Sequence, residues 1–97
     1  MESRPNPIRV LVADRSEAIQ QAISTRLARE PDMRIVNGVA SSAELLAQLE
    51  RFLPDVILLD ANLDGQVAEA CAQIAARSRQ PAVLLHALYD SPELRTQ

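Results

Sequence analysis

The chain has 97 residues, 47% of them apolar and 24% charged, which is the composition of one globular domain and excludes a disordered chain. Its net charge of −3 is small and has the wrong sign for a nucleic-acid-binding surface, and no apolar run approaches the roughly 18 residues of a membrane span. The single cysteine, Cys71, excludes an internal disulfide and favours a reducing, cytoplasmic setting.

Four apolar segments alternate with helical patterns along the chain, which predicts an α/β fold with a parallel sheet. After a disordered tail at residues 1–7, the segment Ile8–Ala13 is predicted to be the first strand. Ser16 then offers a helix N-cap, and apolar residues follow at helical spacing as far as Leu27. Pro31 is expected to end this helix.

The middle of the chain contains the second and third predicted strands. The second strand is predicted over residues 33–40. Ser41, with Glu44 three residues later, forms a capping box that begins a helix extending to Phe52. The third strand, Val56–Leu59, is apolar throughout, so we expect both of its faces to be buried, as in a central strand of a parallel sheet.

The last part of the chain carries one more helix and one more strand. The helix contains Val67, Cys71 and Ile74 on one apolar stripe, which predicts a buried thiol. The fourth strand is predicted over Ala82–Leu88. The residues Ser91–Glu93 then give a helix start signal only four residues before the chain ends, so we expect the domain at residues 8–97 to be incomplete at its C-terminus.

Three polar residues lie at or near the ends of predicted strands: Asp14, Asp60 and His86. Ligands of an open parallel sheet bind beyond the carboxyl ends of its strands. If the first and third strands are neighbours, the two carboxylates converge and can bind a divalent cation, or one can attack a phosphoryl group. The alternative is structural: both acids cap turns, and His86 is a packed, hydrogen-bonded side chain.

The segments VLVAD, EPDMRIV and PDVILLDAN, at the first, second and third strands, resemble the receiver domain of bacterial two-component response regulators. The chain is similar in particular to receivers that precede a helix-turn-helix DNA-binding domain. The resemblance extends from Ile8 to about Gln97. It implies a flavodoxin-like, doubly wound parallel sheet of strand order 2-1-3-4-5, in which this chain supplies 2-1-3-4 and lacks the fifth strand and the last helix.

The resemblance also implies roles for individual residues. Asp60 matches the phosphate-accepting aspartate, Asp14 matches the first acid of the pair that binds Mg²⁺, and the main-chain carbonyl of Asn62 matches a further metal ligand. The second acid is Arg15 here, and His86 stands at the switch position, where the family has a hydroxyl. The family's phosphate-binding lysine has no counterpart, because all ten basic residues are arginines.

These departures from the family pattern remove groups that stabilise charge in phosphoryl transfer. We therefore expect weak Mg²⁺ binding, slow or absent phosphorylation of Asp60, and an Arg15–Asp60 contact in the place of the metal.

Three functions stay open at this point. The preferred one is a degenerate receiver of a response regulator in phosphorelay signal transduction, attached to a DNA-binding output in its parent. It would not be an enzyme, and its partner would be a sensor histidine kinase or another signalling protein. The second is a pseudo-receiver, a protein interaction or dimerisation module independent of phosphate. The third, a small enzyme using Asp14, Asp60 and His86, is disfavoured because the chain has no glycine-rich phosphate loop and no nucleophile elbow.

The fourth predicted strand also has a consequence for assembly. Its sequence AVLLHAL has no charge, glycine or proline, which are the usual protections of an edge strand. We therefore expect self-association through this strand or the C-terminal segment.

Overall fold

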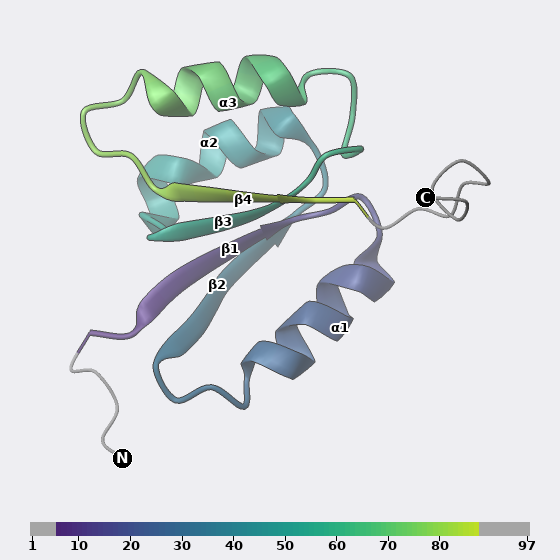
Figure 1. The fold of residues 1–97 in the computed structure, drawn as a ribbon, viewed down its shortest axis with the longest axis vertical. Helices are drawn as coiled ribbons and strands as arrows, with labels where there is room; N and C mark the ends of the chain where they lie inside the picture. The colour runs from purple at the N-terminus through teal and green to yellow at the C-terminus, as the bar shows by residue number, and fades with distance from the viewer. Residues whose placement is uncertain (1–5, 88–97) are drawn as a thin grey trace, which may run out of the picture.

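The computed structural model describes residues 6–87, which form three layers with a four-stranded sheet in the middle (Figure 1). One helix, α1 (Glu17–Leu27), covers one face of the sheet, and α2 (Ser42–Phe52) and α3 (Val67–Ala75) cover the other. The strands are β1 (Ile8–Ala13), β2 (Met33–Val39), β3 (Val56–Asp60) and β4 (Ala82–His86).

All four strands are parallel and lie in the order β2-β1-β3-β4, which confirms the predicted α/β fold and strand order. The second strand ends one residue earlier than predicted, and the third one residue later. The fourth strand ends at His86, so Ala87 does not belong to it, contrary to the prediction. The predicted strand end at Leu88, the predicted helix start at Ser91–Glu93 and most of the predicted N-terminal tail lie outside the described residues. No helix in the described range 6–87 is long and apolar enough to cross a membrane.

Two serines begin helices as predicted. The Ser16 hydroxyl accepts a hydrogen bond from the Ile19 N–H at the start of α1, and the Ser41 hydroxyl accepts one from the Glu44 N–H at the start of α2. The Glu44 carboxylate accepts the N–H of Ala40, one residue before the N-cap N–H that a capping box uses. The two serine contacts each satisfy a backbone donor that the first helical turn leaves without an intrahelical partner.

The end of α2 is fixed by residues far apart in the sequence. Leu53 adopts a left-handed conformation with φ of 44°, and the Arg9 guanidinium donates hydrogen bonds of 3.0 and 2.6 Å to the Phe52 carbonyl. The Arg9 N–H in turn donates to the Asp55 carboxylate. These contacts join the start of β1 to the turn between α2 and β3. Sequence periodicity gave no sign of them.

The main core lies between the sheet and the α2–α3 layer. Its nine buried members form one connected cluster: Leu11, Ala13, Val39, Leu45, Leu49, Ile57, Leu59, Leu63 and Ile74. Cys71 packs against this cluster but is only half-buried. Burial of such a cluster from water is the main stabilising contribution to a fold of this size.

The expectation that both faces of β3 are buried is wrong for one face. Ile57 and Leu59 are fully buried towards α2 and α3, but Val56 and Leu58 are only half-buried. The reason is that a single helix, α1, covers this second face within residues 6–87, and none of its residues is fully buried.

Within the described residues β4 is an edge strand. Leu84 and Leu85 are 56% and 59% exposed, although both belong to an apolar segment. Only Val83 of this strand packs against the core cluster.

Candidate functional site

The strand register brings the three predicted site residues to one edge of the sheet. β1 pairs with β3 so that Ala13 lies opposite Leu59, and Asp14 and Asp60 are the next residues along these two strands. β3 pairs with β4 so that Asp60 lies directly opposite His86. Parallel strands present their carboxyl ends at the same edge, so the sequence positions translate directly into proximity.

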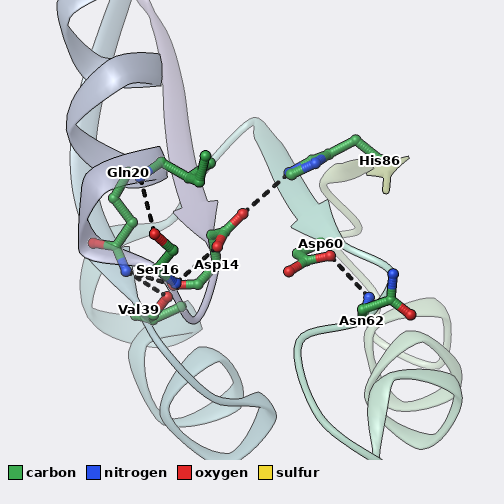
Figure 2. Close-up of polar contacts among 8 residues, drawn as sticks. Asp14, Ser16, Gln20, Val39, Asp60, Asn62 and His86 are labelled. Atoms are coloured by element: carbon green, nitrogen blue, oxygen red, sulfur yellow. Dashed lines mark hydrogen bonds and ion pairs between the residues drawn. The ribbon is translucent and has the colours of Figure 1, made fainter. Parts of the chain in front are cut away.

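The three side chains form a compact cluster (Figure 2). One ligand atom from each of Asp14, Asp60 and His86 lies within 4.8 Å of the other two. The His86 Nε2 atom is 4.0 Å from the Asp14 Oδ2 atom. The Asp14 side chain is 5% exposed and that of His86 is 24% exposed, so the cluster is largely shielded from water.

Backbone contacts hold Asp14 in a fixed orientation. Its Oδ1 atom accepts a hydrogen bond of 2.8 Å from the Ser16 N–H, and its own N–H donates to the Val39 carbonyl at 3.0 Å. The Gln20 side-chain amide donates to the carbonyls of both Asp14 and Val39, at 2.6 and 3.1 Å. Gln20 thus ties the ends of β1 and β2 to α1.

The position of Gln20 depends on Gly38. A Cβ atom at Gly38 would collide with the Gln20 side-chain oxygen, so glycine leaves the space that this amide occupies. Sequence reasoning missed Gln20 because it lies outside the apolar stripe of α1 and has no local capping role. A glycine inside an apolar strand was the one available signal, since it often marks a close approach of other groups.

His86 is not hydrogen-bonded, contrary to the structural alternative considered from the sequence. Within residues 6–87, neither of its buried ring nitrogens has a hydrogen-bond partner. The distance of 4.0 Å to Asp14 is too long for a hydrogen bond. The backbone of His86 is nevertheless well anchored, because its carbonyl accepts the Ala61 N–H at 2.7 Å.

The loop after Asp60 closes tightly. The Asn62 N–H donates to the Asp60 Oδ1 atom at 2.9 Å, and the Leu63 N–H donates to the Asp60 carbonyl at 3.0 Å. The Leu63 side chain is buried in the core cluster. Asn62 therefore lies beside the carboxylate, and its N–H fixes the rotation of that carboxylate. The role of its main-chain carbonyl as a metal ligand stays a prediction.

Asp64 fastens the same loop to the start of α2. Its carboxylate accepts hydrogen bonds from the Ser42 N–H at 2.8 Å and the Ser42 hydroxyl at 2.7 Å, and one from the Gln66 N–H at 2.9 Å. These bonds lower the pKa of the Asp64 carboxyl, with the Ser42 N–H as the largest cause, followed by the Ser42 hydroxyl and the Gln66 N–H. Sequence reasoning missed this contact, which joins two loops 22 residues apart.

The predicted Arg15–Asp60 contact is absent. Arg15 is exposed, and the ion pairs within residues 6–87 are Arg77–Glu50 and the long His86–Asp14 contact. The imidazole of His86, and not the Arg15 guanidinium, is the group beside the two carboxylates (Figure 2).

The donor set of the cluster matches that of an Mg²⁺ site only in part. Mg²⁺ requires near-octahedral coordination by oxygen atoms. Asp14 and Asp60 supply two carboxylates, but Arg15 replaces the second acid of the pair, and the third side chain in the cluster is an imidazole.

Comparisons with known proteins agree on the kind of domain. No family model matches the chain. The chain is 35% identical over 85 residues to a protein-glutamate methylesterase/protein-glutamine glutaminase of Nitrobacter hamburgensis, covering 84% of this chain and 22% of that protein. It is 29% identical to the DNA-binding transcriptional activator DevR/DosR of Mycobacterium tuberculosis, covering 89% of this chain and 40% of the activator.

Solved structures give the same result. The signal receiver domain of the response regulator NarL from Mycobacterium tuberculosis matches with a TM-score of 0.79 and 26% identity, over 93% of this chain and 73% of that one. CheY6 of R. sphaeroides, solved in complex with the P1 domain of CheA3, matches with a TM-score of 0.73 and 21% identity, over 94% of this chain and 74% of that one. The chain spans less than half the length of the two full-length relatives above. The strand order, the paired acids at the sheet edge and these matches together show that the chain belongs to the receiver domains of two-component response regulators.

Proposed function

We propose that this chain is a degenerate receiver, which retains the fold and the acceptor aspartate of the family but carries out little or no Mg²⁺-dependent aspartyl phosphorylation. The observation that carries the proposal is the make-up of the cluster. Asp14 and Asp60 converge as in a receiver, but the position of the second acid is an exposed arginine, and an imidazole stands beside the carboxylates.

The chemistry of phosphoryl transfer supports this proposal. In phosphorylation, an Asp60 oxygen would form the new bond to phosphorus while the donor's leaving group departs. The protein accelerates such a reaction almost entirely by positioning the reacting groups and stabilising their charge. In this chain Arg15 stands where the family has the second metal-binding acid. This change raises the barrier without altering the fold.

The partner of such a module is another signalling protein, and a sensor histidine kinase is the first candidate. CheY6 was solved with the P1 domain of CheA3, which is an example of a protein with this fold bound to a signalling partner. The relatives include a transcriptional activator and methylesterases, each much longer than this chain. We infer that the chain regulates an attached output, with transcription regulation as the preferred output, and is not itself an enzyme.

A second function, phosphate-independent self-association, is favoured by one specific observation. The edge strand β4 exposes Leu84 and Leu85, and an unprotected apolar edge strand is a template for pairing with a second chain. In this alternative the interaction surface, and not Asp60, carries the function.

The phosphorylation proposal is tested by intact-mass measurement after incubation with acetyl phosphate and Mg²⁺. We expect little or no adduct on the chain, and Asp60→Asn should give the same spectrum. Arg15→Asp should increase both the adduct and the Mg²⁺ affinity, because it restores the missing acid and removes a positive charge. Rapid, stoichiometric phosphorylation of Asp60 in the unmodified chain would contradict the proposal.

The self-association alternative is tested by sedimentation velocity at tens of micromolar. Leu84→Glu and Leu85→Lys replace exposed side chains, so they should abolish association through β4 without emptying the core. A monomer in the unmodified chain, at every concentration measured, would exclude this alternative.

A further inference from the structure

The His86 side chain is in an unusual state for a histidine in an apolar strand. Both of its ring nitrogens are buried, and neither has a hydrogen-bond partner in the part of the chain that the structure describes. Buried polar atoms are almost always paired, because an unpaired one forfeits the hydrogen bonds that it made to water. An unpaired imidazole that lies beside two carboxylates is therefore a candidate metal ligand.

The two carboxylates are arranged as metal ligands commonly are. Asp14 uses its Oδ1 atom to accept the Ser16 N–H, and Asp60 uses its Oδ1 atom to accept the Asn62 N–H. Among residues 6–87, no hydrogen bond reaches the Oδ2 atom of either carboxylate, so each retains a free oxygen. Backbone donors that orient a ligand in this way are the usual second layer of a metal site.

We propose that Asp14, Asp60 and His86 bind a divalent transition-metal ion of the Zn²⁺ class. Imidazole nitrogen and carboxylate oxygen are both ligands that Zn²⁺ and Co²⁺ accept, whereas Mg²⁺ prefers oxygen alone. Two carboxylates and a neutral imidazole also balance the charge of the ion. The replacement of a hydroxyl position by His86 thus changes which metal the site selects.

The geometry is close to what such an ion requires. Ligand atoms at about 2.1 Å from a tetrahedral ion are about 3.4 Å apart. The three ligand atoms here lie within 4.8 Å of one another, so the most distant pair needs to approach by about 1.4 Å. Asp60 and His86 are only partly buried, so rotation of their side chains allows this approach, while Asp14 is held by Ser16.

The chain offers a clean control for this proposal. His86 is its only histidine and Cys71 its only cysteine, so these two residues are the only nitrogen-ring or thiol side chains that could bind Zn²⁺. Cys71 lies on α3 and packs against the core, away from the cluster residues. Cys71→Ser is therefore a matched variant that removes the alternative ligand and leaves the proposed site intact.

The test is calorimetric titration of the full chain with Zn²⁺ and, separately, with Mg²⁺, near neutral pH. We expect one Zn²⁺ per chain, bound at least about 100-fold more tightly than Mg²⁺. His86→Ala should weaken Zn²⁺ binding by about 100-fold or more, and Cys71→Ser should leave it unchanged. Equal affinity for the two metals, or an unchanged Zn²⁺ affinity in His86→Ala, would overturn the proposal.

A second readout protects the test against a variant that fails to fold. The ¹⁵N signals of the single imidazole in the unmodified chain should shift on addition of Zn²⁺, and Co²⁺ should give visible absorption without a thiolate charge-transfer band. Imidazole signals that do not move at saturating Zn²⁺ would exclude His86 as a ligand. The result is independent of the acetyl phosphate experiment. Strong phosphorylation of Asp60 would contradict the proposal of a degenerate receiver, but it would not contradict the proposed Zn²⁺ site.

Discussion

On one face of the sheet, α2 and α3 bury a continuous apolar cluster that includes Leu45, Ile57 and Leu63. On the other face, α1 buries none of its residues completely, and a shallow apolar pocket lies between α1 and β3, lined by Ile19, Ala22, Ile23, Arg26, Leu27 and Leu58. The helix on this side is attached to the strand ends by the polar contacts of Gln20. Both faces of the sheet are therefore covered by apolar residues, since Val10 and Val12 of β1 are buried outside the α2–α3 cluster, but on the α1 side the hydrogen bonds of Gln20 add to incomplete burial of the helix.

This difference indicates which face of the sheet contributes most to stability and which face can more easily accept a partner. The α2–α3 face also carries the Ser42–Asp64 contact that fixes the loop after Asp60. The α1 face has an apolar surface that can accept a partner without first breaking a packed core. Substitutions on the two faces should therefore have unequal effects.

The largest effect should come from emptying the main core. Leu45→Ala is expected to lower the free energy of unfolding by about 2–5 kcal/mol, because it removes a fully buried side chain and leaves a cavity. The matched helical variant Ile23→Ala, on the half-buried face, should cost only about 1 kcal/mol. Urea unfolding of both proteins provides the comparison. Equal losses would show that the α1 face is as well packed as the other.

The next effect concerns the loop after Asp60. Asp64→Ala should cost about 1–3 kcal/mol, since the N–H and hydroxyl of the buried Ser42 lose their acceptor. Glu69→Ala, an exposed acid of α3, serves as the control and should change little.

The same carboxylate predicts a dependence on pH. The pKa of Asp64 is lowered in the folded chain, so its contribution is complete above the ordinary aspartate pKa of about 3.9 and is lost as the pH falls through the lower folded value. The difference in unfolding free energy between the unmodified chain and Asp64→Ala should be constant from pH 7 to about 5 and should narrow below about pH 4. A difference that stays constant down to pH 2 would argue against these hydrogen bonds.

A smaller effect is expected from the polar attachment of α1. Gln20→Ala removes two hydrogen bonds to strand-end carbonyls and should cost about 1–2 kcal/mol. Gly38→Ala should displace the same amide and have a similar cost. The double variant should therefore be less destabilised than the sum of the two, as measured in a double-mutant cycle. Simple additivity would mean that Gly38 acts independently of Gln20.

The smallest effect belongs to the exposed ion pair between α2 and the turn that follows α3. The Arg77 guanidinium contacts the Glu50 carboxylate at 2.7 Å, but the Glu50 side chain is 81% exposed. Glu50→Gln should change the free energy of unfolding by about 0.2–1 kcal/mol, and 1 M salt should erase the difference. A larger loss would indicate that this pair holds the two helices together.

Local patterns predicted the elements well because each has a local cause. β1 has the predicted bounds, and Ser16 and Ser41 cap the helices that they were expected to cap. α1 ends at Leu27, four residues before Pro31, and a turn at residues 28–29 follows it. The proline therefore does not itself mark the last helical residue. A helix end that has no specific capping residue is not marked by a single position in the sequence.

The residues of the candidate site could be predicted from the sequence, but the hydrogen bonds that hold them in place could not. Asp14, Asp60 and His86 converge because the register of parallel strands converts strand-end positions into neighbours. The contacts of Gln20 and Asp64 join segments 19 and 22 residues apart, and side-chain-to-backbone bonds of that kind leave no periodic pattern in a sequence. The exposure of Arg15 could not be predicted either, because its opposite charge favoured a contact with Asp60 that the structure does not contain.

The central place of β1 has a consequence for how the domain is made. This strand is the first of the sheet to leave the ribosome, yet one of its two partners, β3, begins only at Val56. At a synthesis rate of about 5–20 residues per second, the apolar β1 waits several seconds for that partner. During this interval, of its two partner strands only β2 is available for pairing. The nascent β1–α1–β2 segment therefore exposes the apolar edge of β1 that later pairs with β3, and a chaperone can recognise this edge.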